Sequence, residues 1–93
     1  MIRSFGDEET ERIFQQERSR KLPPDIQKRA LVKLLLLEAA TTEDDLKVPP
    51  SNHFEHLQGK LKDFCSVRIN NQWRIQFKII NNELYDVSIV DYH

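Results

Sequence analysis

The sequence closes on three side chains that can take part in chemistry, Asp91, Tyr92 and His93. An imidazole ordinarily titrates at about pH 6.5, so His93 can act as a general acid or base near neutral pH. Asp91 could orient that imidazole, and Tyr92 could donate a hydrogen bond. An equally simple interpretation is that the three residues are only a solvent-exposed chain end.

Two arginines, Arg68 and Arg74, form a second candidate group, because a guanidinium presents a planar fork that suits phosphate. Both lie where apolar and polar residues alternate, which places the polar side chains on one face of a strand. That predicted polar face holds Ser66, Arg68, Arg74, Gln76, Lys78 and Ser88. The solvated side of an antiparallel sheet gives the same pattern without any function. Arg74 could also serve only as an ion-pair partner of Asp86, so both interpretations stay open.

Three potential metal ligands, His53, His56 and Cys65, lack the spacing of a structural zinc site. Cys65 shares a predicted strand face with Val67 and Ile69, which favours a small core residue over a nucleophile. We therefore expect neither a metal ion nor a cofactor.

The elements that must position these residues become clear in the final third of the chain. Its segments alternate apolar with polar residues and are rich in Val, Ile, Phe and Trp, which predicts a three-stranded antiparallel meander. Asn pairs at 70–71 and 81–82 separate the segments, and Asn tolerates the positive φ of tight hairpins. The predicted strands span residues 64–70, 72–80 and 83–91.

Two helices are predicted ahead of the meander. Residues 24–40 begin with Pro and Asp, which suit a first turn, and carry a broad apolar stripe at helical spacing. The stripe consists of Ile26, Ala30, Leu31, Leu34, Leu35 and Leu37. Residues 8–20 form a more polar helix, with acids at its start and arginines at its end. Residues 2–5 alternate like a short strand. Together these elements predict an α+β domain over residues 1–93, with a four-stranded sheet covered by helices.

The composition limits the function classes. Ninety-three residues fit one domain, and a net charge of −1 excludes binding of nucleic acid by bulk electrostatics. The longest apolar run, residues 34–37, is far too short to span a membrane, and the first residues lack the apolar core of a secretory signal. A single cysteine cannot form an internal disulfide. We expect a cytoplasmic protein.

Two stretches resemble a known family. The run from Ser66 to Phe77, SVRINNQWRIQF, and the ending Val-Asp-Tyr-His at 90–93 are similar to the HigB toxins of the RelE/ParE superfamily of bacterial toxin–antitoxin modules. The opening Met-Ile-Arg-Ser-Phe and the Leu-Gln-Gly at 57–59 also fit. The resemblance covers essentially the whole chain.

The resemblance implies a RelE-like fold, with two N-terminal helices packed on a mostly antiparallel four-stranded sheet. It also implies a ribosome-dependent endoribonuclease that cuts mRNA in the A site of the 70S ribosome by metal-independent attack of a 2′-OH. The implied partner is a HigA-type helix-turn-helix antitoxin, through which the toxin contacts DNA only indirectly. Membrane association is not implied.

The resemblance further assigns roles to residues of this chain. Arg68 and Arg74 would hold the scissile phosphate, while Asp91, Tyr92 and His93 would supply acid–base and base-stacking groups. The general base of some HigB toxins is a histidine before the Leu-x-Gly element, where this chain has Glu55. Glu55 could act as that base, and His56 could replace it only if the loop shifted. The predicted RNA or ribosome contacts are Lys60, Lys62, Gln76 and His56.

Two other functions stay open at this point. One is a non-catalytic, ParE-like module that blocks a target protein by docking. The other is a degenerate toxin with a decayed site, which the acidic pI and the residue at position 55 keep possible.

Overall fold

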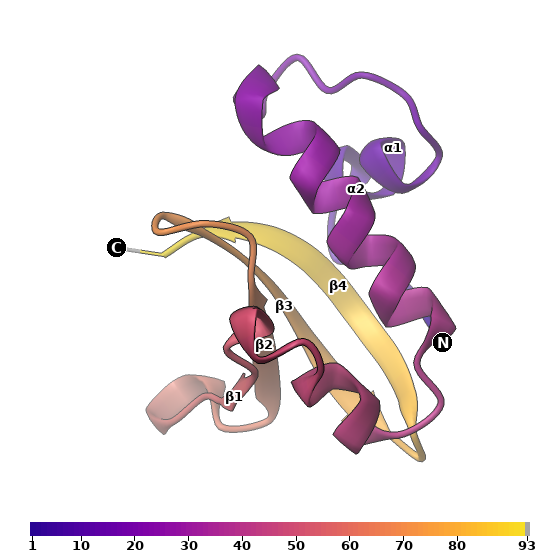
Figure 1. Ribbon diagram of the computed structural model, residues 1–93, viewed down its shortest axis with the longest axis vertical. Coiled ribbons are helices and arrows are strands. Elements are labelled where there is room, and N and C mark those ends of the chain that lie inside the picture. Colours follow the sequence, from indigo (N-terminus) through magenta and orange to yellow (C-terminus); the bar gives the residue numbers. More distant parts are fainter. Residues whose placement is uncertain (93) are drawn as a thin grey trace.

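The computed structural model describes residues 1–92, which form a four-stranded antiparallel sheet with two α-helices over one of its faces (Figure 1). The sheet order follows the chain order, β1-β2-β3-β4. Short 3₁₀ turns connect the second helix to the sheet. The principal elements are α1 (Glu8–Phe14), α2 (Pro24–Ala39), β1 (Glu55–His56), β2 (Phe64–Arg68), β3 (Trp73–Ile80) and β4 (Glu83–Asp91).

The predicted meander is confirmed. β2, β3 and β4 pair in antiparallel register, so that Ser66 lies opposite Gln76 and Gln76 lies opposite Ser88. The hairpin between β3 and β4 turns through Asn81 and Asn82, whose φ angles of 52° and 63° are left-handed. Asparagine accepts this backbone conformation more readily than most residues, which explains the sequence signal.

The fourth strand is not the one that the sequence predicted. Residues 2–5 make only two isolated parallel bridges to β4, Ile2 with Leu84 and Phe5 with Val87. The fourth strand is instead β1, a two-residue strand that pairs with β2 at the opposite edge. A strand this short has no periodicity to detect, so no pattern of residues indicated it.

The first helix is much shorter than predicted, because α1 ends at Phe14 rather than near residue 20. Gln16 adopts a left-handed φ of 64°, which ends the helical path. The chain is then held by Ser19, a buried residue whose hydroxyl donates to Glu9 at 2.7 Å. The Gln27 side chain accepts from the Ser19 amide at 3.1 Å and donates to its carbonyl. These local polar contacts replace the helix.

Thr10 ties α1 to the sheet and supports a test of this packing. It is fully buried, and its Oγ1 accepts from the Ile89 amide at 2.9 Å. We expect Thr10→Val to lower the free energy of unfolding by about 1–3 kcal/mol, because a buried N–H loses its acceptor. Urea unfolding measures this change. Thr10→Ser keeps the hydroxyl and should recover much of the loss; equal losses in both variants would contradict the role of this bond.

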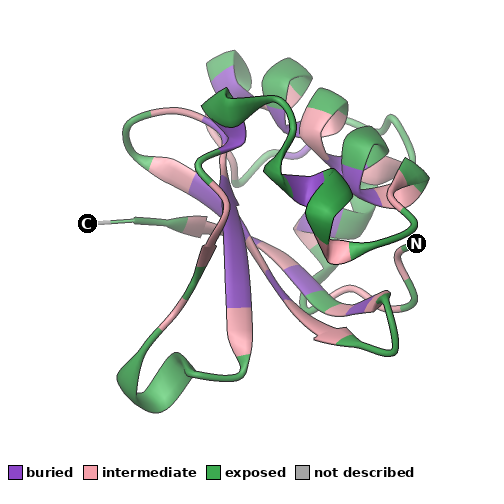
Figure 2. Cartoon of the chain, turned by 60° about the horizontal axis from the view of Figure 1, so that its bottom comes forward, coloured by how far each residue is buried: buried purple, intermediate pink, exposed green. Residues whose placement is uncertain are grey.

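The core lies between α2 and the sheet, where buried residues face one another (Figure 2). From α2 the buried side chains are Ile26, Ala30, Leu34 and Leu37, which confirms the inward stripe. Leu35, which the sequence placed on the same stripe, is instead 48% exposed. The predicted stripe was too broad because a helix packed on one side only buries about half of its circumference.

One irregularity in β4 changes the predicted faces. Asp86 has a left-handed φ of 54°, and the register between β3 and β4 shifts between Gln76 and Lys78. Leu84 and Val87 are therefore the buried residues, and Tyr85, which strict alternation would place on the face of Val87, is only half-buried. An extra residue in one strand of a pair reverses the alternation beyond it.

Candidate functional site

The candidate site lies on the sheet face that points away from the helices, and Arg74 is its centre. On β3, Ile75 and Phe77 are fully buried in the core, so Arg74 points to the opposite face. The predicted polar face is nevertheless not open to solvent here, because Arg74 is only 7% exposed and Ser66 only 1%. The connection that leads into β1 contacts Arg74 here, through the backbone carbonyl of His53.

A buried guanidinium needs compensating partners, and Arg74 has several. Its Nε donates to Ser66 Oγ at 2.8 Å, and its Nη2 donates to the backbone carbonyl of His53 at 2.5 Å. The Glu55 carboxylate lies 3.7 Å from the same nitrogen. The alternative pairing with Asp86 is wrong, since Asp86 lies 3.6 Å from Lys78 instead.

Two further side chains complete the group around Arg74. The Tyr92 hydroxyl donates to Glu55 Oε1 at 3.2 Å, and the Arg74 guanidinium carbon lies 5.1 Å from the centre of the Tyr92 ring. Glu55 is brought in by β1, where it pairs with Ser66 of β2. The carboxylate on β1, the guanidinium on β3 and the phenol just after β4 thus come together. Such a group can bind an anion and exchange a proton beside it.

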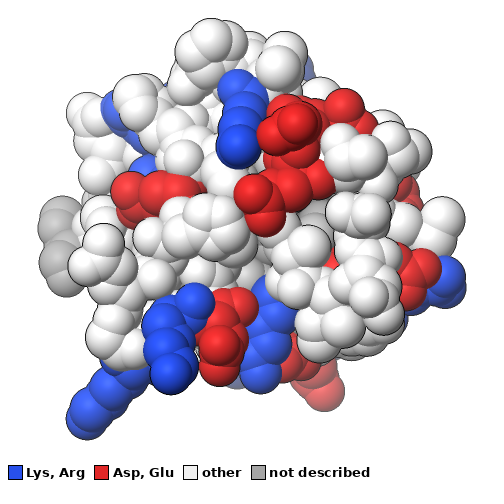
Figure 3. Space-filling model, turned by 90° about the horizontal axis from the view of Figure 1, so that it is seen from below, with Lys and Arg blue, Asp and Glu red and all other residues white. Residues whose placement is uncertain are grey.

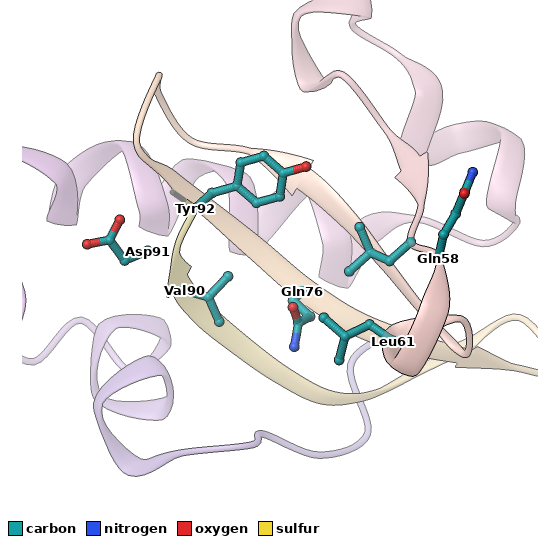
Figure 4. A pocket seen from close by; sticks show the side chains of 7 residues that line it. Gln58, Leu61, Gln76, Val90, Asp91 and Tyr92 are labelled. Atoms are coloured by element: carbon teal, nitrogen blue, oxygen red, sulfur yellow. The ribbon is translucent and has the colours of Figure 1, made fainter.

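A cavity of ≈ 550 Å³ opens beside this group, between β4 and the segment after β1 (Figure 4). The Tyr92 ring extends over it, and Gln76 and Val90 point into it from neighbouring strands. Of its other lining residues, two are apolar leucines and two are polar. The full lining is Leu57, Gln58, Leu61, Gln76, Val90, Asp91 and Tyr92.

Two residues predicted for the site point elsewhere. Asp91 is among the residues that line the cavity, but its side chain is directed to the other side of the chain from the Tyr92 ring (Figure 4), and its carboxylate accepts from Gln72 Nε2 at 3.1 Å. Arg68 lies opposite Arg74 in the register, but its guanidinium donates to Asn71 in the β2–β3 turn. The third predicted acid–base residue, His93, lies outside the described residues.

The predicted RNA contacts divide between two places. Gln76 lines the cavity. Lys60 lies on the 3₁₀ turn Gly59–Leu61 beside the cavity, Lys62 directly follows that turn, and both lysines are exposed. Basic and acidic side chains are interspersed over the face seen in Figure 3, so no single-sign surface dominates that view. Any attraction for phosphate must come from a few placed cations.

His56 occupies the opposite side of β1 from Glu55. Its Nδ1 lies 3.2 Å from Cys65 Sγ, and its Nε2 lies 3.3 Å from Glu43 Oε2. Neighbouring residues of a strand point to opposite faces, so Glu55, and not His56, enters the group around Arg74. Cys65 is a buried core residue, as predicted.

The environment of Cys65 predicts a pH effect. Burial, aided by the negative charge of Glu43, raises the pKa of the thiol from 9.0 to about 11. Between these values the unfolded chain loses this proton and the folded chain keeps it, so stability should fall as the pH rises from 9 toward 11. Urea unfolding across this range should show a steeper decline for the unaltered chain than for Cys65→Ala. Identical slopes would show that the thiol is not the cause.

Within the described residues, no three His, Cys, Asp or Glu side chains converge to hold a metal ion. No helix in that part of the chain is long and apolar enough to cross a membrane.

Sequence reasoning missed the supports of the site. Ser66 was placed on the polar face but given no role, although its hydroxyl holds Arg74. The His53 carbonyl is a backbone acceptor that no side-chain pattern reveals, and the lining residues Leu57 and Leu61 were given no role in the site. The one usable signal in the sequence was the polar alternation of the meander strands, in which Ser66 lies opposite Gln76.

Comparison with known proteins assigns the family. Residues 3–93 match the model of the RelE-like toxin of the type II toxin–antitoxin system HigB. The chain belongs to the HigB-like family of RelE-type toxins. It is 40% identical over 82 residues to Toxin HigB-1 of Vibrio cholerae serotype O1, covering 87% of this chain and 86% of the relative. An uncharacterized protein of Haemophilus influenzae is 35% identical over 86 residues, covering 91% and 85%.

A solved structure supports the fold of this HigB-like toxin. The YoeB–YefM complex from Staphylococcus aureus contains a chain with a TM-score of 0.59 and 21% sequence identity, covering all of this chain and 95% of that one. At this identity the likeness concerns the fold alone. It confirms the predicted small RelE-like α+β architecture.

Proposed function

We propose that this HigB-like toxin is an endoribonuclease that cleaves mRNA in the ribosomal A site without a metal ion. The observation that carries the proposal is the convergence of Arg74, Glu55 and Tyr92 beside an open cavity, on the sheet face that the helices leave uncovered. Glu55 occupies the sequence position at which some HigB toxins have a catalytic histidine. The group therefore combines a cation for the phosphate with a candidate base.

In this mechanism Glu55 removes the proton from a ribose 2′-OH, whose oxygen then attacks the adjacent phosphorus. Arg74 stabilises the charge that grows on the phosphate oxygens, and Arg68 joins it once RNA draws its side chain from Asn71. The bond to the 5′-oxygen breaks and an acid protonates that oxygen, for which His93 is the candidate. The products are a 2′,3′-cyclic phosphate and a 5′-OH. Tyr92 donates a hydrogen bond or stacks on a base.

The remaining predicted residues have supporting roles. Lys60, Lys62 and Gln76 contact the RNA backbone or ribosomal RNA around the cavity mouth, and Asp91 fixes the end of β4 through Gln72. His56 lies on the other side of β1 and is proposed only to hold that strand in place. We further propose that a HigA-type helix-turn-helix antitoxin neutralises the toxin in the cytoplasm. The description of the matching family, a toxin of a type II toxin–antitoxin system, supports such a partner.

Expression of the chain without an antitoxin, followed by primer-extension mapping of mRNA ends, tests the proposal. The expected result is growth arrest with new ends inside translated reading frames. Growth arrest without new ends would favour a ParE-like module that blocks a target by docking. A chain that neither arrests growth nor cuts RNA would be a degenerate toxin.

A further inference from the structure

The outer surface of α2 is an apolar feature that the candidate site does not use. Val32, Leu35 and Leu36 are 52%, 48% and 40% exposed, and they follow one another at helical spacing on the side of α2 that faces away from the sheet. In Figure 2 this side of the helix is mostly exposed, while the inward side is buried. Adjacent apolar side chains that stay exposed in this way mark an interaction surface more often than isolated ones do.

The charges next to these residues have one sign. Between Asp25 and Glu38, α2 carries Lys28, Arg29 and Lys33 and no acidic residue. Lys28 and Arg29 are exposed, and neither forms an ion pair with the described residues. Beside Lys28, a cavity of ≈ 330 Å³ separates α2 from the end of α1. The outer side of α2 therefore carries the two cations Lys28 and Arg29, one turn after the exposed Asp25, and is apolar in its second half.

We propose that this α2 stripe, defined as Lys28, Arg29, Val32, Leu35 and Leu36, binds an amphipathic segment of the antitoxin. The segment would place acidic residues over the two cations and apolar residues over the other three positions. The inference rests on the proposed function, because it assumes an antitoxin partner. It adds that the contact lies on the helical layer, so this segment leaves the group around Arg74 uncovered.

Other occupants fit the stripe less well. A second copy of the chain, paired antiparallel, would bring Glu38 toward the cations, but the Glu38 carboxylate already accepts from the Ile2 amide at 3.0 Å. RNA would satisfy the cations and leave the three apolar side chains without partners. An acidic, amphipathic protein segment satisfies both halves at once.

The test measures binding of the proposed HigA-type antitoxin at full length, by isothermal titration calorimetry with toxin variants. Lys28→Glu/Arg29→Glu and Leu35→Asp are each expected to weaken binding by about tenfold or more. The matched control, Lys60→Glu/Lys62→Glu, makes the same charge change beside the candidate site and should shift the affinity by less than about threefold. These are surface positions, so circular dichroism should show folded variants.

The outcomes separate this inference from the proposed function. If the unaltered chain does not bind that protein, the proposed partner is wrong. If it binds and only the Lys60/Lys62 variant is weakened, the partner stands and the α2 stripe is not its site. Light scattering could instead show that the unaltered chain is a dimer and that Leu35→Asp is a monomer. That result would assign the stripe to a second copy and overturn the inference. Both α2 variants should still arrest growth, because they leave the cleavage site intact.

Discussion

Arg74→Ala is expected to lower RNA cleavage by about 10²–10³-fold, the effect of removing one preorganised charge from a transition state. Arg74 is held at Nε and Nη2 by Ser66 and the His53 carbonyl, so it needs little reorganisation when charge grows on a phosphate. The loss should appear in a translation extract as a slower appearance of cleaved mRNA ends. In cells, the same substitution should relieve growth arrest.

The control for Arg74 lies four residues along the same strand. Lys78 is also cationic and on the same sheet face, but it pairs with Asp86 and lies away from Glu55. Lys78→Ala should therefore leave cleavage within about threefold of the unaltered chain. Arg74→Lys keeps the positive charge and loses only the forked hydrogen bonds. It therefore helps to distinguish an effect of the lost charge on cleavage from an effect on folding. Equal losses in the Lys78 and Arg74 variants would indicate a nonspecific effect of surface charge.

The meander could be predicted from the sequence because its signals are local. Alternation over several residues and paired asparagines at the turns specify strands and hairpins without knowledge of the partner elements. The end of α1 could not, because it depends on side-chain hydrogen bonds between Ser19 and Gln27, which no pattern of residue types along the chain reveals. The same holds for β1, which exists only because β2 offers an edge for it.

The candidate site shows the same division between local and distant information. Arg74 and Tyr92 could be named from the resemblance of two sequence stretches, but their contact depends on how β3 and the end of β4 are aligned. The choice between Glu55 and His56 could not be made from the sequence, because it depends on which face of β1 each residue occupies. Their partners settle the faces: Arg74 and Tyr92 for Glu55, Cys65 and Glu43 for His56.

The second large expected effect concerns Glu55 and His56, which are neighbours on β1 and occupy opposite faces. Each can be replaced by glutamine in a matched pair of variants. Glu55→Gln keeps the size and hydrogen-bonding capacity of the side chain and removes its ability to take a proton. We expect a loss of about 10²–10⁴-fold in cleavage, the usual range for a general base. His56→Gln, one residue away, should cost less than about threefold, because the imidazole contacts Cys65 and Glu43 on the other side of the strand.

Replacing Glu55 by histidine makes the argument for a base stricter than loss of activity alone. An imidazole ordinarily titrates at about pH 6.5, well above a model-peptide carboxylic acid at about 4.3. If position 55 supplies the base, Glu55→His should recover part of the activity lost in Glu55→Gln and move the acid side of the pH–rate profile upward. A structural role for the carboxylate would give no such shift. A large loss of cleavage in His56→Gln together with an active Glu55→Gln would instead assign the base to His56. The two faces of β1 would then have to exchange when RNA binds.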